Sequence, residues 1–196
     1  MFLKRFKIRQ LTKKLKAMQQ NRIHNQPPDE VLAKEVSYYH QLAGIYNSLI
    51  GKKAYPFASD MASACLRAAS TLEDSEAQYL LGKKLLDEAK LREQLQKGGL
   101  FASPSNERQM NQLYEEAHVY LQASERLGHI QAKRLRGLSY INGWGVTADK
   151  DQGFDLVVAS IEQENSWDRV PQIFASIGLN KPEFFSALTK HRGNKG

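Results

Sequence analysis

Residues 132–153 read AKRLRGLSYINGWGVTADKDQG, and this stretch decides the fold that the sequence predicts. Within it, small residues, a tyrosine and an aspartate recur at offsets typical of two short helices joined by a tight loop. These positions are Ala132, Gly137, Tyr140, Gly143, Gly145, Val146, Asp149 and Gly153. The small side chains at Ala132 and Gly137 allow a second helix to approach the first one closely. The stretch therefore predicts a closely packed helical hairpin.

The loop of this hairpin carries its own signals. Gly143 stands where the first helix needs a residue in the left-handed conformation to end. Gly145 allows the loop to double back, and Val146 can fill the apolar gap between the two helices. Asp149 is a good N-cap for the second helix, because its carboxylate accepts a hydrogen bond from an exposed backbone N–H.

Together with Ala123, Gly128 and His129 before it, this pattern resembles one unit of the Sel-one-like repeat, a relative of the tetratricopeptide repeat. The resemblance implies an all-α solenoid of antiparallel helix pairs, since one pair cannot bury its apolar face alone. It gives structural roles to Ala132, Gly137, Tyr140, Gly143, Gly145 and Asp149. It also implies a non-catalytic scaffold or adaptor for a protein partner, which in bacteria often serves envelope, secretion or host-contact complexes. An ordinary helical hairpin with a glycine-rich turn is the alternative.

The rest of the chain extends this organisation to one repeat domain, residues 29–190. Apolar periodicity and cap residues predict helices at 29–50, 56–70, 74–97, 103–127, 129–142, 150–164, 167–177 and 182–190. Ala43, Gly82 and Gly137 occupy equivalent places in the first helices of three pairs. An insertion at about 88–115 is expected to lengthen both helices of the second pair and to project the loop GGLFASPSN.

The net charge of +7 comes from the segment before this domain. Residues 1–28 contain no acid and eight basic residues: Lys4, Arg5, Lys7, Arg9, Lys13, Lys14, Lys16 and Arg22. Ile8, Leu11, Leu15 and Met18 form an apolar helical stripe in the same segment. We therefore expect an amphipathic arm, and the first seven basic residues are predicted to bind an anionic surface, either a membrane or an acidic partner.

Other readings of this arm remain open. The first alternative is a solvated or weakly docked helix, and an organelle transit peptide is a further one. Nucleic acid is disfavoured, because the body is close to neutral and no recognition fold follows the arm. A smaller basic tail, residues 191–196, closes the chain, beside Lys190.

No motif in the sequence predicts catalysis, a metal site or a cofactor. The five histidines, His24, His40, His118, His129 and His191, never pair with an acid or cysteine at metal-ligand spacing. The Gly143-Trp144-Gly145 loop lacks the strand and the downstream Lys-Ser/Thr of a phosphate loop. We therefore expect no enzyme, with no catalytic, metal-binding or cofactor-binding residue.

The single cysteine and the absence of a long apolar run indicate the expected location. Cys65 cannot form an intrachain disulfide, which fits a reducing compartment. No apolar run reaches the roughly 18 residues that span a bilayer. The expected location is cytoplasmic, with peripheral membrane association through the arm as an alternative.

Partner-contact residues are predicted from aromatic and basic side chains that fall off the apolar stripes, and from the tip of the inserted loop. They are Tyr38, Tyr79, Lys83 and Arg134 on first helices, and Leu100 and Phe101 on the loop. The loop could instead fold back on its own helices. Two other functions remain as alternatives: a regulatory subunit that contacts a membrane or nucleic acid through the arm, and a small-molecule-binding enzyme subunit.

Overall fold

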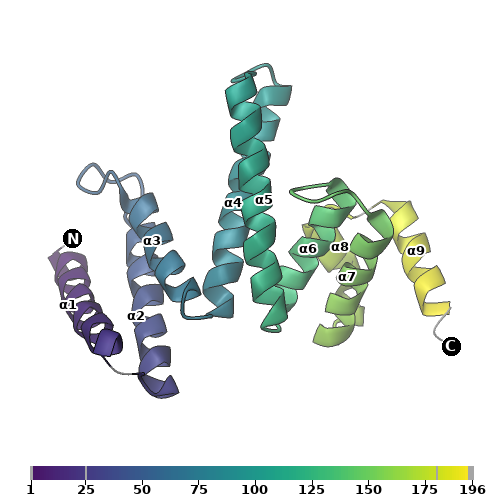
Figure 1. The fold of residues 1–196 in the computed structure, drawn as a ribbon. Helices are drawn as coiled ribbons and strands as arrows, with labels where there is room; N and C mark the ends of the chain where they lie inside the picture. Colours follow the sequence, from purple (N-terminus) through teal and green to yellow (C-terminus); the bar gives the residue numbers. More distant parts are fainter. Residues whose placement is uncertain (1, 25, 180, 194–196) are drawn as a thin grey trace. The chain divides into compact units, whose positions relative to one another are not determined.

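The computed structural model describes residues 2–24, 26–179 and 181–193, and these residues form helices and no strand (Figure 1). The helices are α1 (Phe2–His24), α2 (Asp29–Asn47), α3 (Ala58–Ser70), α4 (Ser75–Lys97), α5 (Pro104–Arg126), α6 (Ile130–Asn142), α7 (Lys150–Glu164), the 3-10 turn η1 (Trp167–Arg169), α8 (Val170–Ser176) and α9 (Pro182–Gly193). The predicted all-α class is confirmed, and each helix predicted for the body is found at or close to its expected place.

The chain divides into two compact units, Met1–Lys84 and Leu85–Gly196. Unit 1 contains α1, α2, α3 and the first part of α4, and unit 2 contains the remainder. The division therefore lies inside α4, whereas the sequence predicts a separate segment 1–28 followed by one repeat domain, residues 29–190. Along the described residues, no helix combines the length and the apolar character that crossing a bilayer requires.

In unit 1, α1 is part of the packed body. Leu11 and Leu15 are only 5% and 4% exposed, and α1 packs against α2. The apolar stripe predicted from the sequence thus exists, and it is covered by this chain's own α2. The next layer is formed by α2 against α3, where Leu42 and Ala43 of α2 and Leu66 of α3 are buried.

Polar contacts also hold α1 in place. The Arg22 guanidinium lies 3.5 Å from the Glu35 carboxylate, which is 1% exposed. Gln19 donates a 2.5 Å hydrogen bond to the Tyr39 hydroxyl, which in turn donates to Glu35. Burial raises the pKa of Tyr39, so this hydroxyl keeps its proton. These contacts satisfy a buried carboxylate, which would otherwise destabilise unit 1.

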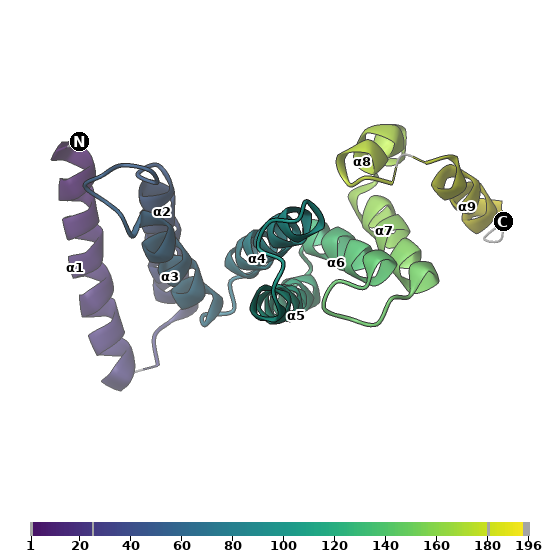
Figure 2. The same ribbon diagram turned by 90° about the horizontal axis from the view of Figure 1, so that it is seen from above.

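Unit 2 is built around α6 and α7, which lie side by side (Figure 2). Their core contains Leu138 and Ile141 from α6 with Val157 and Ile161 from α7. The C-terminal helices extend this core. The ring centroid of Phe174 in α8 lies 6.3 Å from the ring centroid of Phe154 and 5.2 Å from that of Phe185. Of the predicted basic tail, Lys195 lies outside the described residues, as do the side chains of Lys190 and Arg192.

The loop between α6 and α7 has the caps that the sequence predicts. Gly143 ends α6 in the left-handed conformation, with φ +72°. The Asp149 carboxylate caps α7 by accepting a 2.9 Å hydrogen bond from the backbone N–H of Gln152. Gly145 lies against α5, where an added Cβ would stand 2.3 Å from the backbone oxygen of Tyr114. These local interactions fix how α5, α6 and α7 meet.

The two helices around the predicted insertion are long. Both α4 and α5 have 23 residues, whereas α3 and α6 have 13. The extra turns carry the loop 98–103, which joins the two long helices.

Candidate functional site

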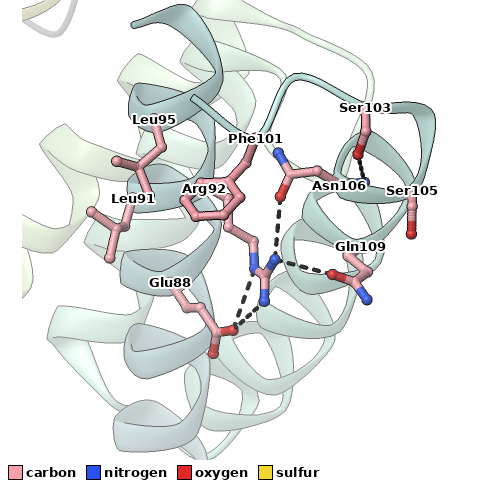
Figure 3. Close-up of a pocket in the computed structure, with 9 residues that line it drawn as sticks. All are labelled: Glu88, Leu91, Arg92, Leu95, Phe101, Ser103, Ser105, Asn106 and Gln109. Carbon is pink, nitrogen blue, oxygen red and sulfur yellow. Dashed lines mark hydrogen bonds and ion pairs between the residues drawn. The ribbon is translucent and has the colours of Figure 1, made fainter. Parts of the chain in front are cut away.

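A groove of about 420 Å³ opens in unit 2 where the end of α4 meets the start of α5 (Figure 3). Its wall on α4 consists of Glu88, Leu91, Arg92 and Leu95. Phe101 comes from the connecting loop, and Ser103, Ser105, Asn106 and Gln109 complete the lining from the α5 side. We call these residues the α4–α5 groove.

Arg92 is the centre of the polar contacts in the α4–α5 groove. Its Nη1 donates to the side-chain oxygens of Asn106, at 3.2 Å, and Gln109, at 3.0 Å. Its Nε and Nη2 both face the Glu88 carboxylate one turn earlier, at 3.4 and 3.2 Å. Figure 3 shows the guanidinium directed from α4 toward the two amides of α5. The side chain is therefore held in one orientation, with its charge balanced by a single carboxylate.

Asn106 connects this arrangement to the start of α5. Its side chain is among the buried polar groups of the chain, and its Nδ2 donates to Gln96 at 2.9 Å. Its backbone N–H donates to the Ser103 hydroxyl at 3.1 Å, which makes Ser103 the N-cap of α5. Pro104 follows as the first helical residue, where a missing N–H has no effect.

The loop between α4 and α5 also has a defined conformation where it leaves α4. Gly99 has φ +80°, its N–H donates to the Gln96 carbonyl, and the Leu100 N–H donates to the Leu95 carbonyl at 2.8 Å. This pair of bonds is the Schellman motif that commonly ends helices. Leu100 and Phe101 are thus carried by a loop that is capped at both ends.

Phe101 has an unusual backbone conformation. Its φ is +57°, in the left-handed region, which disfavours a bulky L-residue by about 1–2 kcal/mol. Yet its side chain is 72% exposed and gains little from burial inside this chain. Leu100 and Leu91 nearby are 58% and 55% exposed. Leu91 and Phe101 line the α4–α5 groove beside the fixed guanidinium of Arg92, and the exposed Leu100 precedes Phe101 in the loop.

A second cluster joins the last turns of α4 to the middle of α5. The Tyr114 hydroxyl donates a 2.7 Å hydrogen bond to Glu93, and Lys97 lies 2.7 Å from the same carboxylate. The hydrogen bond from Lys97, followed by that from Tyr114, lowers the pKa of Glu93. Trp144 stacks on Tyr114, with ring centroids 5.9 Å apart, and the Lys90 ammonium lies 4.0 Å from the Trp144 ring centroid. The Gly143-Trp144-Gly145 loop is therefore engaged in packing.

The structure separates the residues predicted to contact a partner. Leu100 and Phe101 are brought together and exposed, as the sequence suggested. The Lys14 ammonium of α1 lies 5.2 Å from the centroid of the Tyr38 ring, so α1 partly covers this half-buried ring. Tyr79 is half-buried and Lys83 is exposed on the part of α4 that belongs to unit 1.

Arg134, also predicted to contact a partner, is engaged within unit 2. Its side chain is 12% exposed, and it donates to Ser160 at 3.1 Å and to Glu164 at 2.9 Å. This bond is the largest cause of the lowered pKa of Glu164. The guanidinium of Arg134, on which the predicted surface contact rested, links α6 to α7 by these hydrogen bonds.

The basic residues predicted to bind an anionic surface fall into two groups. Lys4 donates to the Ser48 hydroxyl at 2.8 Å, and Arg5 donates to the Tyr55 hydroxyl at 3.2 Å. These two residues and Lys14 thus have partners within unit 1. The side chains of Lys7, Arg9, Lys13 and Lys16 are exposed.

The cysteine and two of the histidines, the side chains from which catalysis or metal binding could be expected, are buried or take part in contacts within the fold. Burial raises the pKa of the Cys65 thiol to about 11, so it remains protonated. His40 lies 2.6 Å from Asp74, which also caps α4, and His129 caps α6 through its Nδ1. Within the described part of the chain, no group of three or more His, Cys, Asp or Glu residues is placed to hold a metal ion.

Sequence reasoning missed the polar half of the α4–α5 groove. The spacing of Glu88 and Arg92 indicates a pair on one helix face, and Ser103-Pro104 indicates a helix start. No signal in the sequence shows that Arg92 would reach Asn106 and Gln109 across two helices.

Comparison with known proteins adds no assignment: no protein-family model matches this chain, and no curated protein matches it.

Proposed function

We propose that this protein is a non-catalytic scaffold or adaptor, a solenoid of antiparallel helix pairs similar to Sel-one-like repeats, which binds a protein partner at the α4–α5 groove. The observation that carries the proposal is that the exposed apolar side chains of Leu91 and Phe101 line this groove together with the fixed Arg92. Apolar and aromatic side chains around an arginine are the residues that most often dominate binding energy in protein interfaces.

The repeat geometry of α6 and α7 supports the proposed architecture. Gly137 and Gly153 allow the two helices to touch backbone to backbone, and Gly145 lets their loop pack on α5. These are the positions at which the repeat family places its small residues. A stacked array would then use its longest hairpin, α4 and α5, to present the binding edge.

The defined conformation of the loop supports the proposed partner contact. A surface that is already ordered loses little conformational entropy on binding, which favours affinity. Phe101 is exposed and has a left-handed backbone conformation, which is unfavourable for a bulky residue. Such outliers concentrate at functional sites. The bound segment would place apolar side chains against Leu91 and Phe101 and an acceptor oxygen near Arg92.

Site-specific photo-crosslinking tests this proposal. A photoreactive amino acid replaces Leu100 in one variant and Val119 in the control, since both side chains are exposed and apolar, at 58% and 62%. The expected result is a discrete protein adduct from position 100 that is absent from position 119. The adduct should also disappear in the Phe101→Ser background. Equal adducts from both positions, or none from position 100, would contradict the proposal.

A small-molecule function is the second candidate, and the size of the α4–α5 groove favours it. Its volume of about 420 Å³ lies within the range of ligand pockets. In that case a metabolite should raise the melting temperature, and Arg92→Leu should abolish the shift. Such a shift without a protein adduct at Leu100 would replace the scaffold function by a ligand-binding one.

A further inference from the structure

One face of α1 is exposed to solvent in unit 1, and its composition is distinct. Phe2, Phe6, Arg9 and Lys13 follow one another at spacings of four, three and four, which places them on one face of a helix. At roughly 100° per residue, this face lies opposite the buried pair Leu11 and Leu15. We call Phe2, Phe6, Arg9 and Lys13, with Leu3 at the edge about 90° away, the outer face of α1.

The apolar residues of this face are concentrated at one end. Phe2 is 80% exposed, Leu3 78% and Phe6 53%. The next two turns of the face carry the exposed Arg9 and Lys13. The helix thus presents an apolar first turn followed by a cationic segment.

Charge selects the kind of surface that would cover this face. Residues 1–28 contain eight basic residues and no acid, and the exposed Lys16 lies next to the outer face. An anionic membrane offers phosphate and carboxylate groups for the cations and an acyl region for the phenyl rings. Proteins bind single-stranded nucleic acid along a positively charged groove with aromatic stacking platforms, whereas α1 offers one helix face whose exposed apolar side chains all lie within the first six residues.

From these observations we propose that α1 docks unit 1 on an anionic lipid membrane, with Phe2, Leu3 and Phe6 inserted among the lipids and Arg9 and Lys13 at the headgroups. This inference goes beyond the proposed partner binding and involves a different unit. It also changes the residues that would enter the membrane, because the stripe of Leu11 and Leu15 is covered by α2 and stays there. The helix lies on the membrane and does not cross it.

Vesicle sedimentation of the full chain tests the proposal. The vesicles contain phosphatidylcholine with about 30% phosphatidylserine, or phosphatidylcholine alone, at about 0.1 M and about 0.5 M salt. The full chain should sediment with the anionic vesicles at low salt, weakly at high salt, and hardly at all with neutral vesicles. No sedimentation with anionic vesicles at low salt overturns the proposal.

Two pairs of variants separate the charge from the apolar contact. Arg9→Glu with Lys13→Glu should weaken binding about 30-fold or more, since each cation near an anionic surface contributes about fivefold. The control is Arg108→Glu with Lys150→Glu, which changes the charge equally at exposed positions of unit 2. Phe2→Ser with Phe6→Ser should weaken binding by about tenfold. Its control, Phe57→Ser, removes a 69% exposed phenyl ring elsewhere in unit 1.

Folding and specificity complete the test. Circular dichroism should show unchanged helix content in every variant, because the substituted side chains are exposed. If Phe2→Ser with Phe6→Ser binds as tightly as the full chain, membrane insertion is wrong. If a single-stranded oligonucleotide binds more tightly than the vesicles at the same salt, the assignment passes to nucleic acid.

Discussion

The backbones of Gly137 and Gly153 touch each other reciprocally across the α6–α7 interface. A Cβ added at Gly137 would lie 2.6 Å from the backbone oxygen of Gly153, and one added at Gly153 would lie 2.5 Å from that of Gly137. Backbone atoms cannot move aside as the end of a flexible side chain can. Unit 2 therefore depends on the absence of a side chain at both positions.

Gly137→Ala is expected to destabilise unit 2 by about 3 kcal/mol, because the added methyl group forces α6 and α7 apart. Both tryptophans of the chain, Trp144 and Trp167, lie in unit 2, so urea unfolding followed by tryptophan fluorescence measures the effect. Gly44→Ala is the control, and its unfolding is followed by circular dichroism because unit 1 contains no tryptophan. Gly44 lies within α2 with no atom near an added Cβ, so alanine there should stabilise by up to about 1 kcal/mol. Equal effects of the two changes would refute the steric explanation.

Phe101→Gly should separate stability from binding. Glycine accepts φ +57° without strain, so the free energy of unfolding should stay the same or rise by up to about 1 kcal/mol. Capture of the partner by the crosslinker at Leu100 should nevertheless fall. Removing residues 99–103 is a poorer test, since that deletion takes away the Schellman turn and the Ser103 cap together. A clear loss of stability in Phe101→Gly would show that the ring supports the fold.

Arg134→Met should act on stability and leave partner binding unchanged. The substitution removes the hydrogen bonds to Ser160 and Glu164, and we expect the free energy of unfolding to fall by about 1 kcal/mol. Lys133→Met is the neighbouring control, since Lys133 makes an exposed contact with Gln163 and should change stability by less than about 0.5 kcal/mol. Reduced crosslinking with unchanged stability would restore Arg134 as a contact residue.

Stability of unit 2 should decrease as the pH falls from about 7 to about 5.5, because of His118. Burial, and then the nearby Arg136, lower the pKa of His118 below its ordinary value of 6.5. The unfolded chain therefore takes up the proton first, and acidification through that value favours unfolding. His118→Gln should flatten this dependence in urea unfolding measured by tryptophan fluorescence. The lowered pKa values of Glu93 and Glu164 act only below about pH 4.5, so a slope that persists in the variant would contradict the assignment to His118.

The helix ends could be predicted from the sequence because the signals are local. Gly143 and Asp149 act on backbone groups within a few residues, and the same holds for Ser103 before α5. The docking of α1 could not be predicted in this way. An apolar stripe such as Leu11 and Leu15 fits α2 as well as it fits a lipid surface.

The candidate site was predicted in its apolar part only. Leu100 and Phe101 are recognisable as exposed apolar residues in a loop bounded by glycine and proline. The position of Arg92 depends on Asn106 and Gln109, which lie 14 and 17 residues away on another helix. Arg134 shows the opposite limit, because a basic residue off the apolar stripe can equally well form an ion pair with a neighbouring helix.

The contact between Gly145 and the Tyr114 carbonyl has a consequence for the history of the sequence. Every amino acid other than glycine carries a Cβ, so any change at this codon that alters the residue meets the same backbone oxygen. The exposed Thr147 and Ala148, two and three positions later, face no such obstacle. During evolution Gly145 should therefore stay unchanged while Thr147 and Ala148 are replaced more freely. The glycine can persist at this position on these grounds alone, whatever the rest of the surface binds.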